Sequence, residues 1–232
     1  MVRFTLSTMI TALVSLVSLT GWAAMVVDGK IDDWVNVKSS VKDDQDMKDT
    51  SGDIKLIQAT VDDGNLYLRM SVYGTAAPSM EKTPDGMKNR YYYHWIIDAD
   101  NNPKTGFNNS SYEKSPTKVK KPIGVEKVVM IGWKDGKPNG IEAYNALKDD
   151  EKFSKDYKYA VSGDTLEAEV PLKALGLTEG TTVGFSAFQE GASDDWAVDW
   201  VESIDLKLVS VGPTAVGAQG KLSTAWATLK MR

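Results

Sequence analysis

The sequence contains no cysteine and only one histidine, His94, among its 232 residues. Without cysteine the chain cannot form disulfides, thiolate zinc sites, iron–sulfur clusters or a thiol nucleophile. With one histidine, multi-histidine metal sites are excluded and a Ser-His-Asp triad is restricted to His94. An exported protein of this composition must hold its long loops by packing or by metal ions.

Long apolar runs and an excess of positive charge are also lacking. The formal net charge is −5, and no basic stripe is available to neutralise phosphates, which argues against a nucleic-acid partner. The apolar run between Met9 and Leu19 is short for a stable membrane span, and no later run is longer. Arg3 precedes this run and Gly21-Trp22-Ala23 offers a small-x-small cleavage site, so residues 1–23 are expected to be a signal peptide. We therefore expect a secreted or periplasmic protein whose mature domain spans residues 24–232.

Short alternating apolar segments and frequent turns predict β-strands, whereas helical periodicity is nearly absent. The clearest hairpin joins residues 53–61 to residues 65–73 through the turn Asp62-Asp63-Gly64. Further strands are expected at residues 90–97, 124–133, 141–147, 155–161, 165–170, 183–189 and 222–229. Pro171 and Gly176 bracket a short helical turn. The pattern predicts an all-β fold, an antiparallel β-sandwich that forms a single domain with long loops.

The stretch from Asp98 to Gly106 follows the apolar, aromatic residues 91–97 directly. Asp98, Asp100 and Asn102 place oxygen-bearing side chains at every second position, where a strand is expected to end. Calcium takes roughly 6–8 oxygen ligands and prefers loops rich in carboxylates and carbonyls. This spacing therefore indicates a candidate calcium loop.

The same stretch is not an EF-hand loop. Pro103 stands where the invariant glycine of that loop belongs, and Asn109 stands where its closing glutamate belongs. A polar turn without a metal, of the kind that often connects strands, is the alternative explanation of the pattern.

Several motifs together, in their order and spacing, resemble family 9 carbohydrate-binding modules and their DOMON-like relatives. The motifs are Asp28-Gly29 with Asp33-Trp34, Gly52-Asp53-Ile54, the turn at residues 62–67, residues 98–106, Gly124-Val125-Glu126 and residues 165–176. The resemblance covers nearly all of the mature chain, residues 26–232. The resemblance implies a β-sandwich of immunoglobulin-like layout that commonly binds calcium, with sugars or haem bound by different members.

By this resemblance, Asp98, Asp100 and Asn102 are candidate calcium ligands. A backbone oxygen near Thr105 and the carboxylate of Glu126, from the neighbouring strand, are expected to complete the shell. The role of the ion would be structural, because it would tie a loop to a strand where no disulfide can form.

Sugar binding requires flat aromatic faces together with polar groups that bond to hydroxyls. The candidates for such a platform are aromatic residues at strand ends and an acidic loop: Tyr73, Trp133, Trp196 and Trp200, with Asp195 and Asp199 as hydrogen-bond acceptors. Burial in the core is the alternative for each of these aromatics.

The resulting hypothesis is an exported, non-catalytic binding module for carbohydrate or a cell-surface glycan, stabilised by structural calcium. One alternative is a haem-binding electron-transfer module, with His94 as an axial ligand and Met70, Met80 or Met87 as its partner. Another is a structural extracellular protein whose only ligand is calcium.

Enzymatic function is not expected. Glu167 and Glu169 alternate on one predicted strand, which is typical of a solvated face. Glycoside hydrolysis instead requires two carboxyl groups that face each other across a cleft. The sequence also shows no glycine-rich phosphate loop and no nucleophile elbow.

Overall fold

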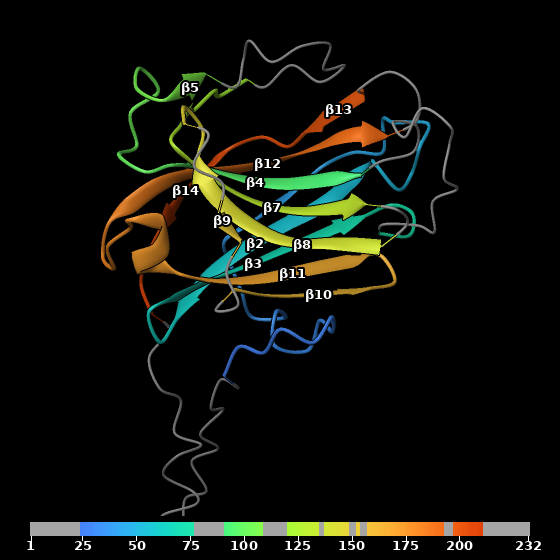
Figure 1. Ribbon diagram of the computed structural model, residues 1–232, viewed down its shortest axis with the longest axis horizontal. Helices are drawn as coiled ribbons and strands as arrows, with labels where there is room; N and C mark the ends of the chain where they lie inside the picture. Colours follow the sequence, from blue (N-terminus) through green and yellow to red (C-terminus); the bar gives the residue numbers. More distant parts are fainter. Residues whose placement is uncertain are drawn as a thin grey trace, which may run out of the picture. The chain divides into compact units, whose positions relative to one another are not determined.

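Two antiparallel β-sheets pack face to face in the computed structural model (Figure 1). The structure describes residues 24–76, 91–108, 120–134, 137–148, 152–153, 157–192 and 197–210. All ladders between the described strands are antiparallel, which confirms the predicted all-β sandwich. These strands belong to one unit, residues 23–213.

The first sheet has five strands in the order β1-β2-β3-β11-β10. Their bounds are β1 Ser40–Lys42, β2 Ile54–Asp62, β3 Asn65–Val72, β10 Lys158–Ser162 and β11 Thr165–Pro171. Strand β3 therefore pairs with β2, its predicted hairpin partner, and also with β11, which follows about 100 residues later in the chain.

The second sheet has seven strands in the order β13-β12-β4-β7-β8-β9, and β14 pairs with the first half of β12. Their bounds are β4 Tyr92–Asp98, β7 Lys127–Lys134, β8 Lys137–Asn145, β9 Lys152–Phe153, β12 Thr182–Ala192, β13 Ala197–Trp200 and β14 Ile204–Lys207. A separate short pair consists of β5 Phe107–Asn108 and β6 Gly124–Val125.

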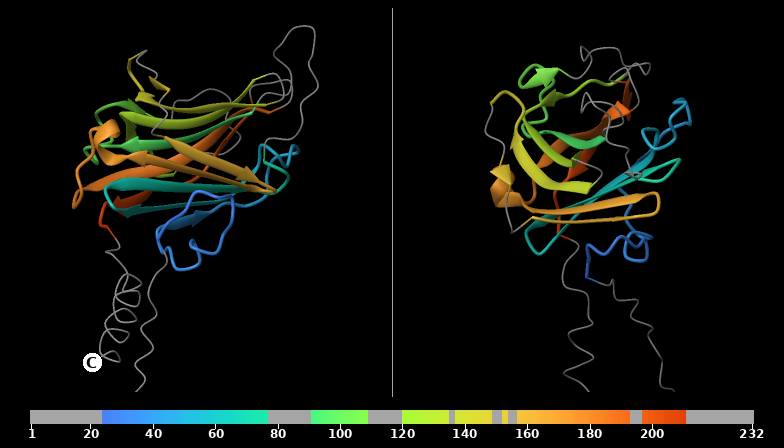
Figure 2. Two further views of the ribbon diagram at one scale, coloured as in Figure 1. Left: turned by 60° about the horizontal axis from the view of Figure 1, so that its bottom comes forward. Right: turned by 45° about the vertical axis from the view of Figure 1, so that its right-hand side comes forward.

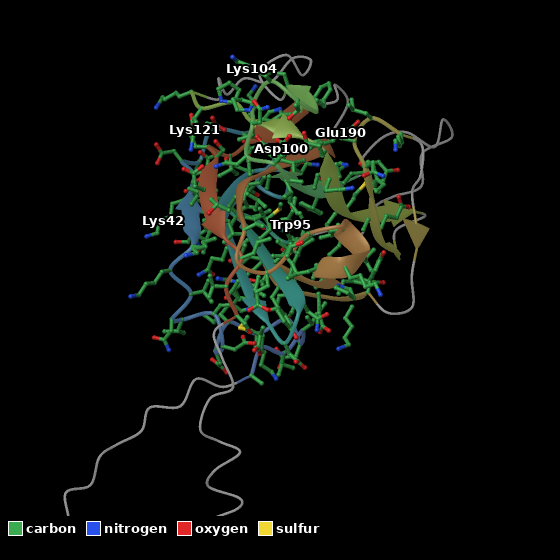
Figure 3. The ribbon with its side chains drawn as sticks, turned by 90° about the vertical axis from the view of Figure 1, so that its left-hand side faces the viewer. Lys42, Trp95, Asp100, Lys104, Lys121 and Glu190 are labelled. Atoms are coloured by element: carbon green, nitrogen blue, oxygen red, sulfur yellow. The ribbon has the colours of Figure 1, made fainter. Side chains whose placement is uncertain are left out.

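Alternation along the strands builds the core between the two sheets. Four alternating residues of β3 are all fully buried there: Leu66, Leu68, Met70 and Val72. Tyr93, Trp95 and Ile97 of β4 contribute to the same core from the other sheet. Figure 3 shows Trp95 within the ribbon. The core thus forms where the period-two pattern of the sequence predicts it.

Turn chemistry also matches the sequence. The β2–β3 turn places Asp63 at φ 45° and Gly64 at φ 73°, the two successive positive angles that a type I′ hairpin turn requires. A 3-10 helix, η2, spans Leu172–Leu175, with Pro171 before it and Gly176 after it. Gly176 has φ 67° and its N–H bonds back to the helix carbonyls, as expected for a left-handed C-terminal cap.

The outer face of the five-stranded sheet is covered by the N-terminal part of the domain, drawn in blue in Figure 2. Met25 and Trp34 pack there against Tyr67 of β3. Glu167 of β11 is completely buried beneath this segment. Its carboxylate accepts hydrogen bonds from the backbone N–H groups of Asp28 and Gly29, at 3.0 and 2.8 Å, and from the indole of Trp34 at 2.8 Å.

Two expectations are therefore corrected. The interpretation of Glu167 and Glu169 as a solvated face is wrong, because residues distant in sequence cover that face and leave the two side chains 0 % and 7 % exposed. The acidic stretch around Trp196 and Trp200, for which a loop was expected, ends in a strand, because Trp200 is the last residue of β13. The strand expected at 222–229 lies outside the described residues.

The described part of the chain contains no helix long and apolar enough to cross a membrane.

The contacts of Glu167 yield a first prediction. Replacing Glu167 with Ala should lower the free energy of unfolding by about 2–4 kcal/mol, because the buried indole of Trp34 and two part-buried backbone N–H groups lose a charged acceptor. Urea denaturation followed by tryptophan fluorescence measures this change. The matched control is Glu169→Ala on the same face. Glu169 pairs with Lys158 at 2.9 Å, and the Lys158 side chain is 64 % exposed, so the loss there should stay below about 1 kcal/mol. Equal losses in the two variants would contradict the anchoring role of Glu167.

Candidate functional site

Strand β4 ends at Asp98 and leads directly into the acidic loop 99–106. Asp98 is 1 % exposed. Its Oδ1 accepts the N–H of Asn102 at 2.8 Å, and its Oδ2 accepts the N–H of Gly124 at 3.0 Å. This one carboxylate therefore fixes both the loop and strand β6 to the end of β4.

Glu126 occupies the interruption between β6 and β7, inside the segment where one continuous strand was expected. Its N–H donates to the carbonyl of Ile97 at 3.0 Å, and its Oε2 accepts the N–H of Ala99 at 2.8 Å. The other oxygen, Oε1, is buried and has no hydrogen-bond partner. A buried carboxylate oxygen without a partner is costly, so this atom marks a place for a donor or a cation.

Three carboxylates converge at this point. Asp98, Asp100 and Glu126 each place an oxygen within 4.8 Å of the oxygens of the other two. Figure 3 shows Asp100 at the end of the domain that also carries Lys104 and Lys121. Nevertheless, among the described residues no ion pair joins the three carboxylates to a lysine or arginine. The structure thus brings together three of the five predicted metal ligands.

The other two predicted ligands, Asn102 and Thr105, order the loop itself. The side-chain oxygen of Asn102 accepts the N–H of Lys104 at 3.2 Å. The hydroxyl of Thr105 donates to Oδ1 of Asp100 at 2.9 Å and lies at 2.9 Å from the carbonyl of Asn102. In this arrangement they hold Asp100 in position, while their backbone carbonyls lie on the side facing β6.

Two glycines allow the loop to approach β6 closely. A Cβ atom on Gly124 would lie 2.0 Å from the carbonyl oxygen of Thr105, and one on Gly106 would lie 2.7 Å from Oε1 of Glu126. Gly106 also adopts φ 68°, which disfavours any residue with a side chain. Larger residues at either position would push the loop away from Glu126.

The electrostatics of the cluster are unfavourable as it stands. Burial is the main cause that raises the pKa of Asp98, and the neighbouring Asp100 raises it further. Burial likewise raises the pKa of Glu126, with added repulsion from Asp100 and Asp98. A divalent cation would remove this repulsion and favour the ionised carboxylates. The donor set, which consists only of oxygens, suits calcium or magnesium rather than zinc or copper.

A second feature is a cavity of about 200 Å³ against the outer face of the seven-stranded sheet. It is lined by residues of seven strands and by one residue that follows β8: His94, Ile96, Phe107, Val125, Val128, Tyr144, Ala146, Phe188, Glu190 and Trp200. Because neighbours along a strand point to opposite faces, this cavity is separated from the core by the sheet. Most of its lining is apolar or aromatic, with a few polar groups among it.

Stacked rings form one wall of this cavity. His94 lies parallel to Phe188, with 4.1 Å between ring centroids and 8° between planes, and Phe188 stacks on Trp200 at 4.4 Å. His94 is 3 % exposed, and its Nδ1 has no hydrogen-bond partner. Burial lowers the pKa of His94 from 6.5 to about 3, so the imidazole is neutral at physiological pH.

The predicted sugar platform is only partly within the described residues. Asp195 and Trp196 lie outside them, and Trp133 lies on β7 in a stretch where only the backbone is described. Trp200 is 1 % exposed and contributes to the outer-face cavity. Its predecessor Asp199 is fully buried, and its Oδ2 accepts the N–H of Ile54 at 2.5 Å, so it points to the opposite face of β13.

Tyr73 is also separated from the cavity. Its hydroxyl donates to the carbonyl of Asp43 at 2.8 Å, on the side of the molecule where β1 and β2 are joined. Tyr73 and Asp199 therefore belong to another part of the surface than Trp200.

Sequence reasoning missed most of the cavity lining. Phe188 and Glu190 alternate along β12 on its outer face, and that alternation was the available signal. Tyr144 comes from β8, which pairs with β7, and Phe107 comes from β5, which pairs with β6; these pairings bring both side chains to the cavity.

The haem alternative loses one of its proposed ligand pairs. Met70 is fully buried between the sheets, whereas His94 faces the outer cavity, so the two side chains cannot ligate one iron. Met80 and Met87 lie outside the described residues. The cavity volume of about 200 Å³ is also below the roughly 300–1,000 Å³ usual for cofactor and drug-sized sites.

No protein-family profile matches the chain, and no curated protein matches its sequence. Among solved structures, the chain is similar to a family 9 carbohydrate-binding module from Caldicellulosiruptor kristjanssonii in complex with cellotriose, at 13 % identity and a TM-score of 0.44. That alignment covers 82 % of this chain and 92 % of the module. A family 9 module from the same organism in complex with glucose aligns at 16 % identity and a TM-score of 0.44, covering 83 % of this chain and 95 % of the module. Both structures belong to the family that the sequence motifs resemble.

The burial of His94 predicts a specific pH dependence. The unfolded chain binds a proton at His94 below about pH 6.5, but the folded protein does so only near pH 3. Stability is therefore lost as pH falls through this window, by at most about 1.4 kcal/mol per pH unit. Urea denaturation between pH 7 and pH 4 should show that wild type loses more stability than His94→Gln. Parallel pH profiles for the two proteins would show that His94 is not buried in its neutral form.

Proposed function

We propose that the chain is an exported, non-catalytic carbohydrate-binding module that is stabilised by calcium. The observation that carries the binding function is the outer-face cavity, where the unpaired Nδ1 of His94 lies among stacked and neighbouring aromatic rings. A pyranose ring has apolar C–H faces and a rim of hydroxyl groups, so it needs this combination of flat rings and few polar atoms.

The cavity favours a small ligand. A volume of about 200 Å³ accommodates a single sugar ring or a chain end better than the interior of a polysaccharide. Half-buried Tyr144 and Phe107 supply walls, and Glu190 supplies a carboxylate that can accept hydrogen bonds from hydroxyls. Neutral His94 offers one nitrogen acceptor or donor at the same place.

Calcium at the Asp98, Asp100 and Glu126 cluster is the second part of the proposal. Three converging carboxylates, a buried Oε1 without a partner and two glycines that admit carbonyl oxygens support it. The ion would join the β4 loop to the β6–β7 junction and would be structural, because none of the three carboxylates lines the cavity.

The absence of catalysis is proposed from the roles of the described carboxylates. Glu167 anchors the N-terminal part of the domain, and Glu169 pairs with Lys158. Neither faces a cleft opposite another carboxyl group, as glycoside hydrolysis requires. Export follows from the expected signal peptide in residues 1–23.

A glycan array followed by titration calorimetry, both with calcium present, tests the binding function. Replacing Tyr144 with Ala removes one cavity wall and should weaken binding of the selected sugar about tenfold, which corresponds to about 1.4 kcal/mol. Tyr159→Ala is the matched control, because Tyr159 is a half-buried tyrosine on the other sheet. Binding of no glycan by wild type would overturn the proposal and favour a structural protein that binds only calcium. Loss of binding in Trp196→Ala but not in Tyr144→Ala would move the site to the predicted platform.

Replacing Glu126 with Gln tests the calcium site, because the difference in Tm between the variant and wild type should change sign when calcium is removed. With calcium present, the variant should melt several degrees below wild type, since each kcal/mol of ligand stabilisation shifts Tm by roughly 2–4 °C in a chain of this length. With EDTA, the variant should melt at or above wild type, because it carries one fewer repelling charge. Differential scanning calorimetry measures both values. A wild-type Tm that EDTA does not change would rule out a structural ion at this cluster.

A further inference from the structure

A second group of carboxylates gathers on the side of the domain where Tyr73 lies. Asp46 and Asp53 come from the connection between β1 and β2, and Asp199 comes from β13. Each places an oxygen within 4.8 Å of the oxygens of the other two. The group therefore joins a loop next to the first sheet to a strand of the second sheet.

Two members of this group are buried with an oxygen that has no partner. Asp53 and Asp199 are both 0 % exposed. Their Oδ2 atoms accept backbone N–H groups, from Met47 at 3.3 Å and from Ile54 at 2.5 Å. Their Oδ1 atoms have no hydrogen-bond partner. In each side chain, the hydrogen bond to Oδ2 fixes the orientation of the carboxylate. The Oδ1 atom remains available to bind a cation.

Asp43 adds to this excess of negative charge. It is half-buried, its Oδ2 also has no hydrogen-bond partner, and its carbonyl accepts the hydroxyl of Tyr73. The nearby cation Lys55 lies 6.0 Å from the Tyr73 ring centroid and pairs with Asp164. Among the described residues, no lysine or arginine forms an ion pair with Asp43, Asp53 or Asp199.

Keeping these carboxylates ionised, buried and close together is energetically unfavourable without a compensating positive charge. Burial is the main cause that raises the pKa of Asp199 to about 8, and Asp43, Asp46 and Asp53 raise it further. Burial together with Asp46 raises the pKa of Asp43 to about 6. Oriented, buried carboxylates with spare oxygens are the environment that a hard cation requires.

We propose that Asp46, Asp53 and Asp199 hold a second calcium ion, with Asp43 beside it. Calcium suits this site better than magnesium, because ligands from a loop and a distant strand form an irregular shell and magnesium demands a near-ideal octahedron. The ion would tie the β1–β2 connection to β13 and so link the two sheets at one edge of the sandwich. It is independent of the Asp98 cluster, with which it shares no residue.

The test counts bound calcium. The full chain is stripped with EDTA, dialysed against buffered calcium, and analysed by inductively coupled plasma mass spectrometry. Wild type should carry two ions per chain. Asp53→Asn, Asp199→Asn and Glu126→Gln should each carry one. Asp44→Asn, an exposed aspartate in the same loop, is the matched control and should carry two.

Each alternative result has a defined meaning. One ion in wild type that survives in Asp53→Asn and is lost in Glu126→Gln overturns the second site and leaves the first. One ion that survives in Glu126→Gln and is lost in Asp53→Asn supports the second site and overturns the first. Asp46→Asn alters an exposed side chain, so it reports on the same ion if the buried variants do not fold.

Melting temperatures distinguish a bound ion from a proton shared within the cluster. With calcium present, Asp199→Asn should lower Tm relative to wild type, whereas with EDTA it should leave Tm unchanged or raise it. An increase in both buffers would mean that the carboxylates share protons and hold no cation, which would overturn the proposal.

Discussion

Buried carboxylates that form no ion pair within the described residues, such as Asp98, Asp53 and Asp199, are the constraint on which this protein depends. The sandwich contains no disulfide, yet it places acidic side chains at the ends of its strands and beneath its N-terminal segment. Where backbone N–H groups and an indole meet the carboxylate, as at Glu167, the charge is satisfied internally. At the two carboxylate clusters such donors satisfy only some of the oxygens, and the proposed calcium ions would supply the missing positive charge.

The two faces of the seven-stranded sheet differ in what they pack against. Its inner face is continuous with the main core, where Trp95 and Tyr93 pack against the five-stranded sheet. Its outer face carries a smaller apolar group, built around Phe188 and Trp200, and a cavity opens there. A rigid, doubly packed sheet beneath the cavity keeps the aromatic rings in place, which lowers the entropic cost of binding a small polar ligand.

Local patterns in the sequence predicted the fold well and the sites only in part. The β2–β3 hairpin, its Asp63-Gly64 turn and the Pro171–Gly176 helical turn depend on neighbouring residues, so the sequence was sufficient for them. The convergence of Asp98 with Glu126 was predictable because the loop is short and a family resemblance supplied the partner strand. The burial of Glu167 was not, since the segment that covers it lies about 130 residues earlier. The approach of Asp53 to Asp199 depends in the same way on contacts between distant parts of the chain.

Asp199 and Trp200 are consecutive on β13 and point to opposite faces of it, one into the acidic group at the sheet edge and the other into the aromatic cavity. One peptide unit therefore belongs to both places. Any shift of that unit changes the position of an oxygen on one side and of an indole on the other. Under the two binding proposals, occupancy at the two places would be thermodynamically linked: an ion that fixes the strand would change the affinity for a sugar, and the sugar would change the affinity for the ion by the same factor.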